Sequence, residues 1–348
     1  MAFINFQPHD YFNTKLYTGN GSAGNAQTGV GFQPDWVWIK NRADAEAHTL
    51  YDAVRGTQKP IYSNLSNAQA TETNGLSSFD SDGFTVGSSG AINGSSDGMV
   101  SWNWKANGQG SSNTDGSINT TYTSANTTSG FSIVKYIGNG SNGATVGHGL
   151  GAVPAMIAVK NLGGTDSWQV YHKNSNATPE DYILQFNTTG EAIDNNTMWN
   201  DTAPTSSVFS IGTDNGVNQN SANYIAYCFA EKKGFSKFGS YVGNGSTWGT
   251  FVNCGFKPAF VMYKNSSVSG GHWQIYDNKR LGYNGANKVL RANLTNAEAD
   301  DEIDLLSNGF KCRATNNNNN NHSGVTYIYM AFSEESIVSS NGVPATAR

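Results

Sequence analysis

The sequence predicts an all-β protein built from three tandem β-sandwich, jelly-roll-like domains, each with one short helical turn. Three observations support this fold class. One apolar segment occurs three times, the motifs that flank it return in the same order, and short strand-like runs alternate with glycine turns along the whole chain.

The recurring segment occupies residues 31–41, 151–161 and 255–265. In each copy a Pro stands three residues after a Gly, a short apolar run follows, and Lys-Asn closes the segment. Proline cannot donate to a β-ladder and therefore belongs at the start of a strand, and the run is too short for a buried helix. We therefore expect a buried strand in each copy.

The flanking motifs extend the repeat to the size of a domain. Tyr-x-Gly-Asn-Gly precedes each segment, at 17–21, 136–140 and 241–245, and a motif ending in Tyr follows it, at 48–51, 168–171 and 273–276. Copies about a hundred residues long are typical of domains that hold their own cores. The predicted domains are 1–106, 107–232 (which starts with a linker) and 233–337, followed by a C-terminal tail, 338–348.

Within each copy the remaining elements are predicted in order. The first sixteen residues, with Phe3, Phe6 and Phe12, form either a lead-in strand or an arm for assembly contacts with a partner. Capping-box spacing within 65–69, 188–191 and 294–298 predicts one helical turn per copy, with the acidic run 300–302 in the first turn of the last one.

Hairpin turns and closing strands complete each copy. Asp-Gly or Asn-Gly turns predict hairpins near residues 82 and 308, and aromatic strands close the copies at 99–104, 224–229 and 327–332. Alternation places Trp102 and Trp104 on one face of the first closing strand.

The segments between strands differ in length and composition. Residues 107–116 have the composition of a flexible linker and 117–124 alternate like an edge strand, whereas only 231–234 join the second and third copies. These uneven linkers predict a bent or extended string of domains. The asparagine run 316–321 is predicted to be a solvent-facing loop.

Composition narrows the function classes. Only 14% of residues are charged, and the net charge is −5 without a Lys/Arg cluster, so nucleic acid is an unfavoured partner. The sequence shows no signal peptide and no apolar run long enough for a bilayer, so we expect no membrane insertion. Cys228, Cys254 and Cys312 occupy non-equivalent positions and are interpreted as buried thiols.

No residue pattern predicts catalysis, a cofactor or a metal. His48, His172 and His272 do not form a recurring triad with Ser and Asp. The carboxylates Asp80 and Asp82 have the spacing of a calcium loop, but the third acid and the downstream Glu are missing, so a turn is the preferred interpretation. We therefore expect a protein that is not an enzyme.

Aromatic residues offer a different kind of site, because Trp and Tyr rings stack on sugars. Trp168 and Trp273 recur at one position of the repeat and are interpreted as core residues. Trp199 and Trp248 have no counterpart and stand among polar residues. They are the candidates for glycan or surface contact.

Several motifs also resemble a known family. Residues 32–42, 50–56, 75–84 and 102–106 resemble a repeated domain of unknown function found in virion proteins of tailed phages, especially marine cyanophages; the second copy departs most from the pattern. The resemblance implies a structural protein of the virion surface, most simply a tail fibre or appendage module for host adhesion. The expected partners are other virion proteins, further copies of this chain and host glycan. A capsid decoration protein and a secreted carbohydrate-binding or glycan-degrading protein are the alternatives.

Overall fold

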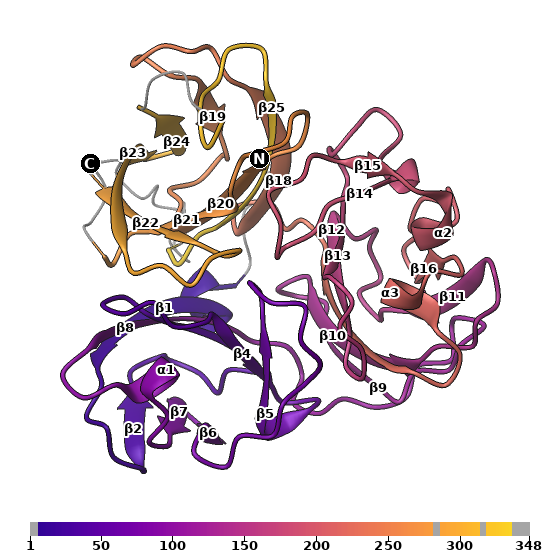
Figure 1. Ribbon diagram of the computed structural model, residues 1–348, viewed down its shortest axis with the longest axis horizontal. Coiled ribbons are helices and arrows are strands. Elements are labelled where there is room, and N and C mark those ends of the chain that lie inside the picture. Colours follow the sequence, from indigo (N-terminus) through magenta and orange to yellow (C-terminus); the bar gives the residue numbers. More distant parts are fainter. Residues whose placement is uncertain (1–5, 281–285, 314–317, 336–348) are drawn as a thin grey trace.

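The computed structural model describes residues 6–280, 286–313 and 318–335. Strands account for 41% of the chain and helices for 6%, so the predicted all-β class is confirmed. Figure 1 shows three β-rich lobes around a common centre. Below, copy 1, copy 2 and copy 3 denote residues 1–106, 107–232 and 233–337.

Each copy contributes an inner antiparallel sheet with the closing strand beside the Pro strand. In copy 1 the order is β1 (Phe12–Thr18), β8 (Gly98–Trp104), β3 (Trp36–Asn41), β4 (Thr49–Asp52) and β5 (Gly56–Tyr62). In copy 2 it is β9 (Tyr122–Asn126), β10 (Phe131–Ile137), β17 (Asn223–Phe229), β12 (Met156–Asn161) and β13 (Gln169–His172). In copy 3 it begins β18 (Ser236–Val242), β25 (Thr326–Phe332), β20 (Phe260–Asn265), β21 (Gln274–Asp277) and β22 (Ala286–Arg291).

A smaller outer layer covers each inner sheet. Its strands are β2 (Asn25–Thr28), β7 (Gly83–Val86) and β6 (Leu76–Asp80) in copy 1, β11 (Ala144–Gly147) and β16 (Val208–Ile211) in copy 2, and β23 (Ala299–Leu306), β24 (Gly309–Cys312) and β19 (Phe251–Asn253) in copy 3. Pairing of β22 with β23 joins both layers of copy 3 into one eight-stranded sheet. The remaining elements are η1 (Pro8–Asp10), α1 (Gly90–Asn93), η2 (Pro179–Asp181), β14 (Tyr182–Ile183), β15 (Ile193–Asp194), α2 (Asn196–Trp199) and α3 (Asn215–Asn218).

The Pro strands are apolar throughout because both of their faces are buried. In β3, Trp36 and Trp38 point toward the centre of the molecule, while Val37 and Ile39 point into a core between the two layers of copy 1. A strand covered on one side only would alternate with polar residues. The continuous apolar run therefore reports a strand between two cores.

The central core is shared by all three copies. It joins Trp104 of copy 1 to Phe229 of copy 2 and to Phe260 and Phe332 of copy 3, with ring centroids 5.6 to 6.5 Å from the Trp104 ring. Each copy also has a smaller core between its own layers. The prediction that every copy relies on its own core is thus incomplete, and the predicted bent or extended string of domains is wrong, because all three copies meet in one core.

Equivalent backbone hydrogen bonds close the three copies into a ring. The amide of Gln69 in copy 1 donates to the carbonyl after the Lys-Asn pair of copy 2, at Leu162 (2.9 Å). The same bond runs from Ala192 of copy 2 to Ser266 of copy 3 and from Glu298 of copy 3 to Arg42 of copy 1, each 2.9 Å. The contacts between neighbouring copies, which we call the seams, are built by the repeats and not by the linkers. The unequal linkers therefore do not prevent the three copies from occupying equivalent positions.

These seam bonds correct several local predictions. Residues 65–69, 188–191 and 294–298 are not helical, because their chains extend across the seams. The prediction of one helical turn per copy is also wrong: α1 lies in copy 1, α2 and α3 both lie in copy 2, and the described residues of copy 3 contain no α-helix. Asp300 belongs to strand β23, not to a helix. In the segment taken for a flexible linker, the amide of Gly108 donates to the Asp35 carboxylate (3.1 Å), and Ser111 pairs with Thr123.

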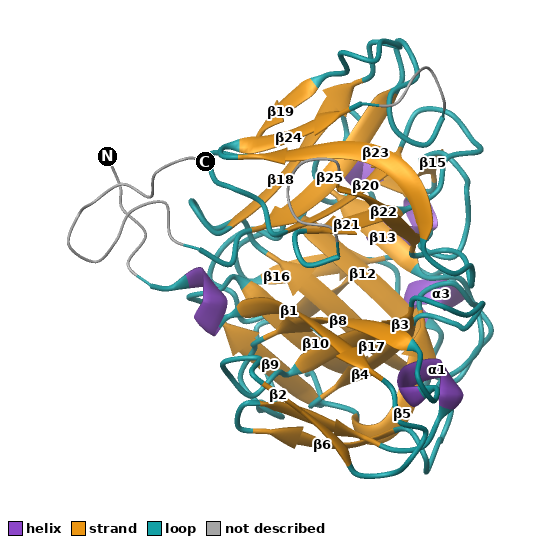
Figure 2. Ribbon diagram, turned by 90° about the vertical axis from the view of Figure 1, so that its left-hand side faces the viewer, coloured by secondary structure: helices purple, strands orange, loops and turns teal. Residues whose placement is uncertain are grey.

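Both ends of the described chain meet at one end of the ring. The Phe6 ring lies 5.5 Å from the Phe235 ring, and the amide of Ser333 donates to the carbonyl of Phe235 (2.8 Å). From there β18 runs for seven residues, roughly 20 Å, toward the opposite end. That opposite end carries α1 and α3, which belong to different lobes in Figure 1 and both lie toward the right-hand side of Figure 2.

Candidate functional site

The end of the ring opposite the chain ends is formed by the three Gly-Asn-Gly motifs, in residues 19–25, 138–144 and 243–250, which we call the tip loops. A buried asparagine holds each one. Asn93 accepts from the amide of Asn20 (2.9 Å) and donates to the carbonyls of Ser22 (2.8 Å) and Gly87 (2.6 Å). Asn218 and Asn321 make the same two bonds to the tip loops of the other copies.

The role of Asn321 corrects the prediction for the asparagine run. Asn320 and Asn321 are fully buried, and the amide of Asn321 donates to the carbonyl of Ser246 (2.7 Å). Asn320 and Asn321 are therefore part of the tip-loop scaffold and do not face solvent, whereas Asn318 and Asn319 are half-buried and 316 and 317 lie outside the described residues.

The tip loop of copy 3 displays Trp248. Its side chain is 72% exposed, and the loop is fixed by Asn321 and by a bond from the Trp248 amide to the Ser246 hydroxyl (3.1 Å). The Lys311 ammonium lies 5.2 Å and the Arg313 guanidinium 5.6 Å from the Trp248 ring centre. An exposed aromatic ring beside two cations, on an ordered loop, is suited to binding a ligand.

The other candidate from the sequence, Trp199, was predicted to be exposed, and this prediction is wrong. It is only 2% exposed, because helical turn α2 directs the ring inward against Tyr171, and its indole N–H donates to the carbonyl of Tyr182 (3.2 Å). The polar residues around it cap the turn: Asn195 accepts from the amide of Thr197 (3.0 Å). Trp168 and Trp273 are core residues, as expected.

The three phenylalanines proposed for assembly contacts have different positions. Phe12 is fully buried in the shared core, stacked against Phe332, so it is not available to a partner. Phe6 is half-buried against Tyr11 and Phe235. Phe3 lies outside the described residues.

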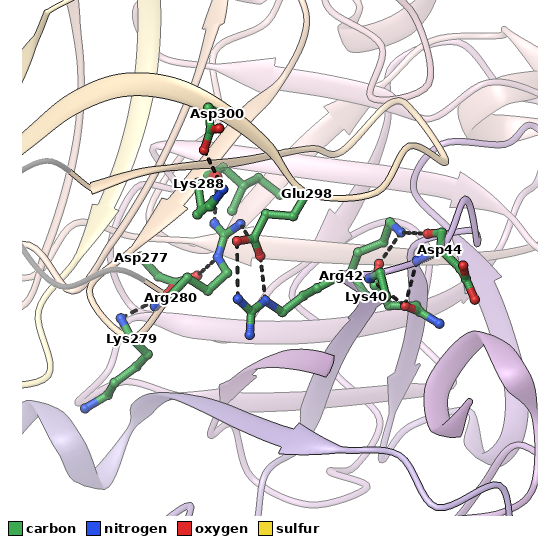
Figure 3. Close-up of polar contacts among 12 residues, drawn as sticks. Lys40, Arg42, Asp44, Asp277, Lys279, Arg280, Lys288, Glu298 and Asp300 are labelled. Atoms are coloured by element: carbon green, nitrogen blue, oxygen red, sulfur yellow. Dashed lines mark hydrogen bonds and ion pairs between the residues drawn. The ribbon is translucent and has the colours of Figure 1, made fainter. Parts of the chain in front are cut away.

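The seams hold buried and half-buried ion pairs that the sequence did not single out. Between copies 3 and 1, Arg280 pairs with Asp277 (2.7 Å) and Arg42 pairs with Glu298 (2.5 Å) (Figure 3). The Asp277 carboxylate also accepts a hydrogen bond from the indole of Trp102 (3.0 Å). The matching Arg55–Asp52 pair lies between copies 1 and 2. Buried ion pairs need such additional hydrogen bonds to offset their desolvation.

Three buried lysines follow the same pattern. Each ammonium donates to the carbonyl of the Asn that follows it, and two of them reach the preceding copy: Lys160 to Ser66 (3.0 Å) and Lys264 to Thr189 (3.4 Å). Burial lowers the pKa of Lys40 and Lys160 to about 8 and that of Lys264 to about 7. The repeated Lys-Asn pair was the signal that could have identified these residues.

The acidic and cysteine candidates have structural partners. Asp82 accepts from the amides of Gly31 (2.7 Å) and Gly29 (2.9 Å), and these bonds lower its pKa. Asp80 accepts from the Thr85 hydroxyl (2.7 Å), so the pair serves the turn. The three cysteines are free and buried, as predicted.

The histidines are also built into the scaffold. Burial lowers the pKa of His172 to about 4, and its ring contacts the carbonyl of Tyr329 (3.1 Å). His48 accepts from the Trp38 indole (2.9 Å). In the part of the chain that the structure describes, no group of three His, Cys, Asp or Glu side chains is placed to hold a metal ion.

One polar cleft, of about 330 Å³, opens at the seam of copies 1 and 2. Arg55, Lys59, Gln69 and Lys135 line it. Arg55 is paired with Asp52, and Lys59 donates to the Thr71 hydroxyl (2.7 Å).

Among the described residues, no helix has the length and apolar character needed to span a membrane.

Comparison with known proteins gives a family but no activity. No curated protein and no solved structure matches the chain significantly. One family model, described as a domain of unknown function, matches residues 7–336 and so spans all three copies. The chain therefore belongs to the DUF7483 family.

Proposed function

We propose that this protein is a non-enzymatic structural protein on the surface of a tailed phage virion, in which three sandwich-like domains act as one rigid module for host attachment or glycan contact. The motif resemblance to phage virion domains suggests the setting. The single observation that carries the proposal is that the two ends of the three-copy ring differ: both described chain ends lie at one end, and the exposed Trp248 lies on a tip loop at the other.

This difference between the two ends suits a module that is anchored through one end and meets its target with the other. Phe6, half-buried beside Phe235, marks the anchoring end, where other virion proteins or further copies of this chain would bind. A tail appendage uses such an arrangement directly.

A capsid decoration protein is the second candidate, and the closed ring favours it in one respect. Three equivalent copies around an axis match a local threefold axis of a shell, which the extended string would not. The two candidates share the virion setting and differ in location.

Mass spectrometry of purified particles tests the proposal. We expect peptides of this chain to copurify with infectious particles through a density gradient. Their absence from particles, or release of reducing sugar from host polysaccharide by the isolated protein, would instead support a secreted glycan-degrading protein.

A further inference from the structure

We infer that Trp248, Phe251, Lys311 and Arg313, which we call the Trp248 patch, bind an anionic saccharide. The inference deepens the proposed function and rests on it for its biological setting. Its physical argument depends only on the residues of copy 3.

The patch combines an aromatic surface with positive charge. Trp248 is 72% and Phe251 44% exposed, and Phe251 lies directly opposite Lys311 in the β19–β24 ladder. As directly opposed partners, Lys311 and Phe251 point to one face of the ladder, and Arg313, just beyond β24, lies beside the same Trp248 ring. A sugar ring can stack on the indole while its carboxylate or sulfate meets the two cations.

The patch is held in place by the scaffold. A Cβ at Gly249 would lie 1.8 Å from the carbonyl oxygen of Cys312, so the tip loop packs directly on β24 at this point. Thr250 also donates to the carbonyl of Val242 (2.6 Å). A ring carried by an ordered loop loses little conformational entropy on binding.

The other two copies serve as an internal control. The register aligns Phe251 with Ala26 and Thr145, and Lys311 with Thr85 and Ser210. The tip loop of copy 3 is also one residue longer, because Phe251 follows Ser246 by five residues and the aligned residues of the other copies follow their Ser by four. Among the three tip loops, only that of copy 3 contains an aromatic residue, Trp248. The fold therefore does not require the patch, because the same scaffold forms with small neutral residues.

Charge decides the class of saccharide. Arg313 pairs with Asp304 (2.9 Å), which neutralises part of the patch, and Lys311 leaves a net positive charge beside the ring. On a chain with a net charge of −5, such a cationic aromatic cluster favours an anionic sugar over a neutral one.

The experiment is titration calorimetry of the full chain with four probes: a heparin hexasaccharide, a hexamer of galacturonate, neutral cellohexaose and a single-stranded DNA 12-mer. The variants are Trp248→Ala and Lys311→Thr, which takes the residue of copy 1. Val153→Ala is the matched control, because Val153 is 54% exposed and precedes β12, at the end that carries the chain ends.

We expect at least one of the two anionic saccharides to bind about tenfold more tightly than cellohexaose, with the sulfated and carboxylated probes distinguishing the anionic group. Trp248→Ala should weaken this binding about tenfold, equivalent to about 1.4 kcal/mol. Lys311→Thr should weaken it and reduce its salt dependence, and Val153→Ala should leave it unchanged.

Equal binding of cellohexaose, no effect of Trp248→Ala, or no binding of either anionic saccharide would overturn the inference. Tighter binding of the DNA with the same dependence on Trp248 would also overturn it and identify the patch as a nucleic-acid site. None of these results changes whether the chain is found in purified particles, so failure here is distinct from failure of the proposed function.

Discussion

Replacing Trp104 with Ala tests whether the three copies fold as one unit. The ring is 1% exposed, and it contacts Phe229 of copy 2 as well as Phe260 and Phe332 of copy 3. Truncating a buried Trp to Ala typically costs about 3–5 kcal/mol. For a chain of this length, about 1.4 °C of melting temperature corresponds to 1 kcal/mol, so the expected shift is about 4–7 °C.

Differential scanning calorimetry shows where that loss falls. Because the ring belongs to the shared core, one main transition should move down as a whole. Trp104→Phe is the control: it keeps an aromatic ring and removes an indole N–H that has no hydrogen-bond partner among the described residues, so it should cost less than about 1.5 kcal/mol. Separate transitions of which only one moves would refute the shared core and restore three independent domains.

Three further predictions follow from single contacts. Asn93→Ala removes the bonds that hold the first tip loop and should lower the free energy of unfolding by about 2–4 kcal/mol in urea titrations; a change below about 0.5 kcal/mol would contradict the role of Asn93. Burial lowers the pKa of Lys264 to about 7 in the folded chain, against an ordinary 10.5, so between these pH values the unfolded chain binds more protons than the folded one. The free energy of unfolding of the native chain, measured against that of Lys264→Met in urea titrations, should therefore rise from pH 7 to pH 10. A difference between the two proteins that does not change with pH would show that the pKa is not lowered. Trp199→Ala should cost about 3–5 kcal/mol and Trp248→Ala less than about 0.5 kcal/mol in thermal melts, and the reverse order would contradict the placement of the two rings.

The sequence was sufficient for the Pro strands, the closing strands and the hairpin turns because their signals are local. Proline placement, the Asp-Gly turn and the alternation of Trp102 and Trp104 identify strand boundaries and faces without knowledge of neighbours. The same alternation correctly places both rings in a core. It does not say whether that core belongs to one copy or to three.

The seams could not be predicted because they depend on contacts between copies. A capping-box spacing at Ser66 and Gln69 suits a helix, but the amide of Gln69 bonds to Leu162 of the next copy, and a tertiary contact overrides a local preference. Trp199 was misplaced for a related reason, since polar neighbours that cap a turn do not indicate that the turn is exposed. The Lys-Asn and Gly-Asn-Gly motifs were visible as repeats, but their buried roles were not.

Cryo-electron microscopy of the intact particle would locate the protein directly. We predict density for a three-lobed ring on the tail or its fibres, attached through the end that carries Phe6 and Phe235, with the tip loops facing outward. Rings spread over the icosahedral shell would replace the appendage with a decoration protein. Particles without this density anywhere on their surface would show that the protein is not part of the virion.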